Sequence, residues 1–140
     1  MLTTIEQATE NFCKHQIRIE HTISNGVSTK STFIAYIDID TQSGEKHRVY
    51  IASDKAFMQR IATLFLEEVQ SDEETLIDMT LETANLLIGS AKVISEEQNT
   101  NPYTINTPHF EKFGEFDFDY DTAKVITIEN DELTIAIKEL

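Results

Sequence analysis

The chain has few of the residues that several binding and catalytic classes require. Of its 140 residues, one is a cysteine, four are glycines and two are prolines, and 11 Lys and Arg are outnumbered by 25 Asp and Glu. The lone cysteine, Cys13, excludes an internal disulfide bond and fits a reducing compartment. The glycines are scattered, so no glycine-rich loop is available to cradle a phosphate group.

The charge balance and the lack of long apolar runs limit the partners. A formal net charge of −14 argues against a surface for nucleic acid or anionic membrane, because both are themselves negatively charged. No apolar run approaches the roughly 20 residues that a membrane-spanning helix needs. The first residues do not resemble a signal peptide. We therefore expect a cytoplasmic protein that binds another protein or a small molecule.

Length and composition fit one globular domain, residues 1–140, with a substantial core. Helical spacing of apolar residues predicts a first helix to about Lys14, a second capped by Ser53, and a long central helix. In the second helix the stripe of Phe57, Ile61, Leu64 and Phe65 reads as core. Alternating or extended patterns predict strands at 16–23, 32–40, 46–52, 103–110, 115–121, 124–128 and 133–138.

This order of elements predicts an α+β domain with a largely antiparallel sheet of six or seven strands and long helices packed on one face. Pro108 lies inside the segment 103–110 and cannot donate to a strand ladder. It therefore marks an edge strand, a bulge or a strand end.

The central helix, predicted over Ser71–Ile94, carries the most informative polar pattern. Ser71 and Glu74 have the spacing of a capping box at its start. At about 100° per residue, one arc of the helix is apolar and small and should face the core. The members of this arc are Leu76, Thr80, Ala84, Leu87, Ala91 and Ile94, with Ile77, Thr83 and Ile88 at its margins.

A second set of residues falls on the opposite side of the helix. Asp78, Glu82, Asn85 and Gly89 are spaced by four, three and four, so they share a strip that should face solvent. A solvated face would explain the acids alone. It does not explain Asn85 and Gly89, which are poor helix formers. Glycine in an exposed helix interior is less favourable than alanine by roughly 1 kcal/mol. Met79, Leu81 and Leu86 flank the strip, and we expect part of this apolar surface to face a partner.

The pattern Asp78-x-x-x-Glu82-x-x-Asn85, followed after twenty-two residues by Pro108, resembles the signature of the CheC, CheX and FliY phosphatases of bacterial chemotaxis. These proteins dephosphorylate the response regulator CheY. The first helix offers no second Glu-x-x-Asn, so the chain is more similar to CheX than to CheC. The resemblance implies a phosphorylated CheY-like regulator as partner and a homodimer joined at sheet edges.

The resemblance also implies roles for individual residues. Asn85 would position the attacking water, and Glu82 would pair with a lysine of the regulator. From its residue type, Gly89 would allow close approach of the partner's backbone. Asp78, one turn before Glu82, either assists docking or is a solvated acid without a role. No cofactor of the protein's own is implied, because the regulator supplies Mg²⁺ and a lysine. Pro108 has a structural role in this interpretation.

Other chemistries are less consistent with the sequence. The acids that alternate with aromatic residues over 115–121 lie too far apart on a strand to wrap one Ca²⁺ ion, so no metal site is expected. The four histidines share no ligand spacing, and Cys13 lacks a supporting base. A non-catalytic binding or dimerisation module with the same fold is the alternative hypothesis.

Overall fold

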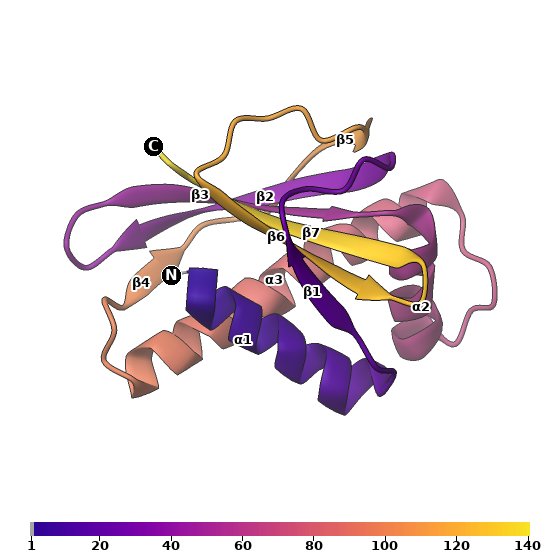
Figure 1. Cartoon of the computed structure of the whole chain (residues 1–140), viewed down its shortest axis with the longest axis horizontal. Helices are drawn as coiled ribbons and strands as arrows, with labels where there is room; N and C mark the ends of the chain where they lie inside the picture. The colour runs from indigo at the N-terminus through magenta and orange to yellow at the C-terminus, as the bar shows by residue number, and fades with distance from the viewer. Residues whose placement is uncertain (1) are drawn as a thin grey trace.

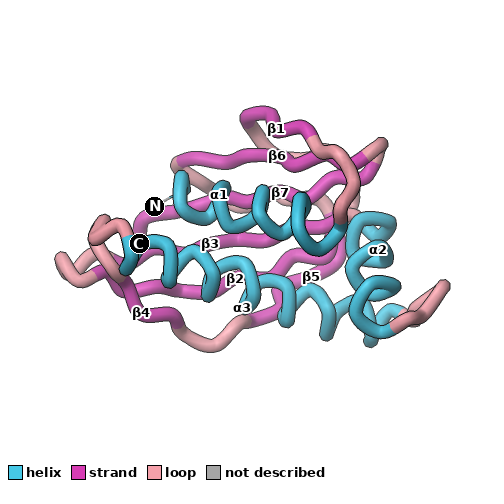
Figure 2. Tube along the Cα trace, turned by 90° about the horizontal axis from the view of Figure 1, so that it is seen from below, coloured by secondary structure: helices cyan, strands magenta, loops and turns pink. Residues whose placement is uncertain are grey.

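The structure is a computed structural model that describes residues 2–140 as one antiparallel sheet covered on one face by helices (Figures 1 and 2). Helix α1 (Leu2–Phe12) continues into a π-helical turn (Cys13–Ile17), and α2 (Lys55–Leu66) precedes the long helix α3 (Glu73–Glu97). The strands are β1 (Thr22–Asn25), β2 (Thr32–Thr41), β3 (Lys46–Ser53), β4 (Tyr103–Ile105), β5 (His109–Gly114), β6 (Thr122–Ile128) and β7 (Asp131–Glu139).

The strand order is β1, β6, β7, β3, β2 and β4, and β5 also pairs with β2. Every pairing within residues 2–140 is antiparallel. The predicted α+β class, sheet size and one-sided helix layer are therefore confirmed. Pro108 lies in the gap between β4 and β5, at a strand end, which is one of the positions expected for it.

The main core lies between the sheet and the helices. In Figure 2, α1 and α3 run side by side across the sheet, and α2 packs at one end. Alternate residues of the central strands, such as Ile37 on β2 and Ile51 on β3, point into this layer and are fully buried. Leu87 and Ile88 of α3 meet them from the other side. This contact determines which side of α3 faces away from the sheet.

The predicted N-cap of the central helix, Ser71, is wrong by one residue. The N-cap is Asp72, whose carboxylate accepts a hydrogen bond from the Thr75 N–H at 2.8 Å, so α3 begins at Glu73. Ser71 is buried, and its N–H donates to the side chain of Gln59 at 2.9 Å. The capping box therefore does not form, because Ser71 bonds to α2 instead.

The predicted strand at 16–23 is also wrong over most of its length. The π-helical turn runs to Ile17, and Arg18 adopts a left-handed conformation in which its N–H donates to the Cys13 carbonyl at 2.7 Å. Only Thr22–Asn25 forms a strand, β1. The apolar residues in this stretch alternate, but Ile17 packs on the core from a helical turn and not from a sheet.

Residues 115–121 pair with no strand, although their alternation predicted one. Their rings cover the face of the sheet that the helices leave open. Phe116 meets Tyr50 of β3 edge to face at 5.2 Å between ring centroids, and Phe118 stacks on the same ring at 5.0 Å. The acids of the segment remain exposed. The alternation thus separates rings from acids in an extended segment that has no ladder partner.

Helix α2 is capped by Asp54, not by the predicted Ser53. One carboxylate oxygen of Asp54 accepts from the Phe57 N–H at 2.7 Å. The other accepts from the Glu132 N–H at 2.8 Å and lies 3.2 Å from the Lys30 ammonium group. A single buried carboxylate therefore joins the start of α2 to the sheet.

We expect Asp54→Ala to lower the free energy of unfolding by about 2–4 kcal/mol, because it removes a buried helix cap and leaves the half-buried Glu132 N–H without its partner. Urea denaturation followed by circular dichroism measures the loss. Asp72→Ala is the matched control, since this cap is exposed and bonds only to Thr75, and its loss should be clearly smaller. Equal losses for the two variants would contradict this account of Asp54.

Candidate functional site

The polar strip predicted on the central helix lies on the outer side of α3. Asp78, Glu82 and Asn85 are exposed, and Gly89 is half-buried. The opposite side of the helix packs on the core through a continuous set of residues. Its members are Leu76, Met79, Thr80, Thr83, Ala84, Leu87, Ile88, Ala91 and Ser95. The predicted outward direction of the strip is therefore confirmed.

The strip is also free of internal partners. Within residues 2–140, the side chains of Asp78, Glu82 and Asn85 make no hydrogen bond and no ion pair. Glu82 and Asn85 are three residues apart on a helix, so their side chains are neighbours on one surface. The arrangement presents a carboxylate and a carboxamide together to whatever approaches α3 from outside.

Of the three apolar residues predicted to flank the strip, one faces inward. Met79 is 6% exposed and belongs to the main core, so its assignment to a partner surface is wrong. The reason is tertiary. Helix α2 packs along the start of α3 and widens its buried arc. The Met58 sulfur of α2 lies 3.7 Å from the Thr83 hydroxyl, which donates to the Met79 carbonyl at 2.6 Å. Leu81 is half-buried, and Leu86 is 37% exposed, as expected for residues beside the strip.

Gly89 is not required by the packing of the protein itself. A Cβ atom built at this position would meet no atom within 4 Å. Glycine in a helix interior costs roughly 1 kcal/mol relative to alanine, and here no internal close contact compensates for that cost. The free space lies one helical turn beyond Asn85, on the same strip.

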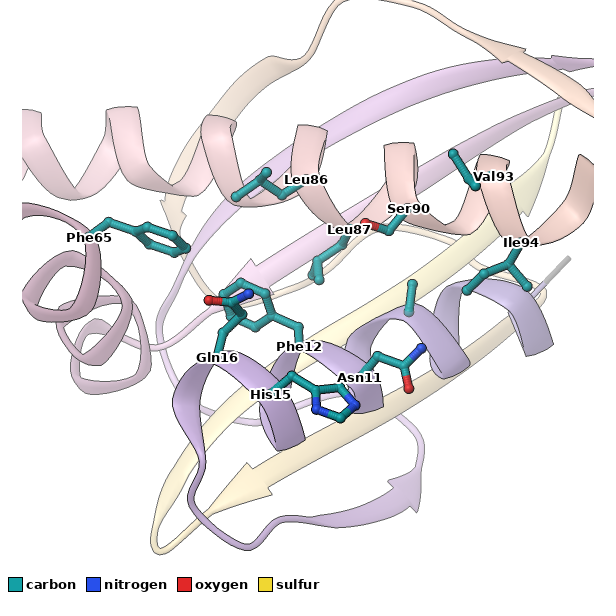
Figure 3. Close-up of a pocket in the computed structure, with 11 residues that line it drawn as sticks. Asn11, Phe12, His15, Gln16, Phe65, Leu86, Leu87, Ser90, Val93 and Ile94 are labelled. Atoms are coloured by element: carbon teal, nitrogen blue, oxygen red, sulfur yellow. The ribbon is translucent and has the colours of Figure 1, made fainter. Parts of the chain in front are cut away.

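The structure adds a groove that the sequence did not predict. It lies between α1 and α3, beside the strip, and is closed at one end by Phe65 of α2 (Figure 3). The prediction that Phe65 and Leu64 are core residues is wrong. Both are exposed, because the buried side of α2 consists of Phe57, Met58, Ile61 and Ala62. One feature of the sequence could have indicated this groove. Leu86 and Val93 are seven residues apart on α3 and therefore lie on the same side of the helix.

Other chemistry-bearing residues are placed less suitably for a site. Cys13 is buried, and this burial, reinforced by the nearby Glu10 carboxylate, raises the pKa of the thiol to about 11. A thiol of this kind is not a nucleophile at neutral pH. Among residues 2–140, no group of three or more His, Cys, Asp or Glu side chains is placed to hold a metal ion. In the same part of the chain, no helix is long and apolar enough to span a membrane.

Sequence comparison gives no match to a protein-family profile and none to a curated protein. Structure comparison does give matches over nearly the whole chain. The chemotaxis protein CheX from Vibrio vulnificus aligns with a TM-score of 0.80 at 16% identity, over 99% of this chain and 98% of that one. CheX in the CheX–CheY–BeF3–Mg²⁺ complex from Borrelia burgdorferi aligns with a TM-score of 0.68 at 15% identity, over 99% of this chain and 97% of that one. Thermotoga maritima FliY aligns with a TM-score of 0.60 at 15% identity, over 97% of this chain and 84% of that one.

The chain therefore has the fold of the CheC, CheX and FliY proteins, which the resemblance in the sequence predicted. At identities of 15–16%, the fold is what the chain shares with these three structures. Within that fold, the strip on α3 and the adjoining groove form the candidate site.

We expect Gly89→Ala to raise the free energy of unfolding by about 0.5–1 kcal/mol, since a Cβ atom fits there without contact and alanine favours the helix. Thermal and urea denaturation measure the change. Gly26→Ala serves as a control of opposite sign, because Gly26 has a φ of +108° that alanine adopts only with strain. A destabilised Gly89→Ala protein would show that the fold itself needs this glycine.

Proposed function

We propose that the protein is a phosphatase that hydrolyses the aspartyl phosphate of a CheY-like response regulator. The observation that carries the proposal is the pair Glu82 and Asn85, exposed and unpartnered on the outer face of α3. Its partner class is supported by the Borrelia burgdorferi CheX structure of the same fold, which is a complex with CheY.

The chemistry follows from what a phosphorylated receiver domain lacks. Its own Mg²⁺ and lysine offset the charge on the phosphoryl group, so a water held in line with the leaving carboxylate is the missing part. The Asn85 carboxamide can hold this water because it both donates and accepts hydrogen bonds. It carries no charge that would repel the phosphoryl oxygens. Asn85 is therefore the catalytic residue of the proposal.

Glu82 and its neighbours hold the two proteins in register. The Glu82 carboxylate pairs with the regulator's lysine in a charge-assisted hydrogen bond, one turn before Asn85. Asp78 extends the same acidic strip by another turn, and Leu81 and Leu86 supply apolar contact beside it. Gly89 leaves the helix backbone accessible, which allows the regulator to come close without a steric clash.

The assembly of the protein is part of the same proposal. The sheet has free edges at β1, which pairs only with β6, and at β4 and β5, which pair only with β2. Such edges can join two copies into one larger sheet. A homodimer joined at β1 leaves the outer face of α3 open, because α3 packs over β2, β4 and β5 near the opposite edge of the sheet.

We expect Asn85→Ala to lower the regulator's stimulated dephosphorylation by at least about 100-fold, because the attacking water is no longer held in place. Glu82→Ala should mainly raise KM, since it removes a docking contact. The assay follows release of inorganic phosphate from CheY of the same organism, loaded with acetyl phosphate.

Asn130→Ala, an exposed asparagine in the turn between β6 and β7, is the matched control and should behave as the unaltered protein. Because Asn85 has no partner within residues 2–140 and alanine favours a helix more than asparagine does, its variant should unfold at the same or a slightly higher urea concentration. Unchanged turnover in Asn85→Ala would reject the catalytic role. If the regulator binds but its phosphate decays at the same rate with and without the protein, the non-catalytic binding module is the correct reading.

A further inference from the structure

The groove beside the strip is open and mainly apolar, with the polar residues Asn11, His15, Gln16 and Ser90 also in its lining. It has a volume of about 500 Å³ and lies between the end of α1 and the middle of α3 (Figure 3). Phe12 on α1 and Phe65 on α2 stack with their ring centroids 6.1 Å apart and close one end. Leu86 and Val93 form the rim on α3, and Leu87 points from α3 toward α1.

The groove is continuous with the proposed catalytic strip. Leu86 lies one helical turn beyond Glu82, and Val93 one turn beyond Gly89, so both stand directly between the strip and the groove. A protein that reaches Glu82 and Asn85 from outside therefore also covers this rim. The two surfaces form one continuous contact area.

The apolar side chains around the groove are left uncovered by the fold. Phe65 is 43% exposed and Val93 is 51% exposed, and Leu86 adds to the same surface. Large apolar groups gathered around a concavity mark an interaction site more often than scattered ones do. Apart from the Phe12–Phe65 stack, these side chains are not part of the core, which is closed beneath them by Leu87 and Ile88.

Charge indicates what kind of partner fits. The residues that line the groove include no Lys, Arg, Asp or Glu, whereas the strip beside it carries Asp78 and Glu82, neither of which has an ion-pair partner within residues 2–140. A fitting surface therefore has an apolar side chain next to a basic one. A second copy of this chain fits poorly, because it would bring two proteins of charge −14 together with their acidic strips adjacent.

We propose that this groove docks an apolar side chain of the response regulator, from the surface beside its phosphorylated aspartate and lysine. The inference rests on the proposed function and adds that the groove determines which regulator binds at the same site. The strip carries out the chemistry, and the groove selects the regulator by the apolar residue that the regulator presents. Phe65, Leu86 and Val93 are then specificity-determining residues and not catalytic ones.

The test compares two double variants. Phe65→Ser with Val93→Ser removes apolar surface from the groove. Leu64→Ser with Val69→Ser is the matched control, because it removes exposed apolar side chains, one of them 91% exposed, that do not line the groove. With acetyl-phosphate-loaded CheY of the same organism, the groove variant should raise KM by about tenfold with kcat unchanged, and the control should change neither.

Each result separates the alternatives. An unchanged KM in the groove variant, with intact circular dichroism, overturns the proposal, and so does a loss of kcat without a change in KM. Loss of a dimer in the groove variant, seen by size-exclusion chromatography, overturns it in favour of a second copy as occupant.

The proposed function can fail independently. If the unaltered protein releases no phosphate, its affinity for the same CheY held with BeF3⁻ and Mg²⁺ becomes the measurement. The groove variant should then bind about tenfold more weakly than the control. Equal affinities, or no binding by the unaltered protein, overturn the docking proposal.

Discussion

The contact between α3 and the sheet governs the direction of every residue on that helix. Leu87, Ile88 and Ala91 are buried against the strands, and fully burying one large side chain contributes about 1.5–3 kcal/mol. Turning the helix by one residue would rotate this face by about 100° and expose it. The outward direction of Glu82 and Asn85 is thus imposed by the core, because these side chains have no bonds of their own within residues 2–140.

This division of labour explains why the site tolerates residues that the fold does not favour. The inner face of α3 supplies the stability, so the outer face can carry an asparagine and a glycine in a helix interior. Gly89 has free space where a Cβ atom would be. Stability alone would place alanine there. A residue that costs stability and has no internal role is consistent with selection by something outside the chain.

The sequence correctly predicted helices whose apolar pattern repeats over many turns and strands that find a pairing partner in the sheet. α3 extends over 25 residues, so its inner and outer faces could be assigned from periodicity. The segments 16–23 and 115–121 alternate as strands do but lack a pairing partner over most of their length. The exposure of Met79 was predicted wrongly for a related reason. Helix α2 packs on that side of α3, and the sequence around Met79 does not indicate this contact. The groove depends on three helices and could not be read from one.

The free strand edges and the strip on α3 face in different directions. The free strand edges at β1 and at β4 and β5 lie in the plane of the sheet, whereas the strip lies on the exposed side of α3, a helix that covers one face of the sheet. Two copies joined edge to edge, as proposed above, would carry two such strips. A partner released from one subunit would then have a second site within the same assembly.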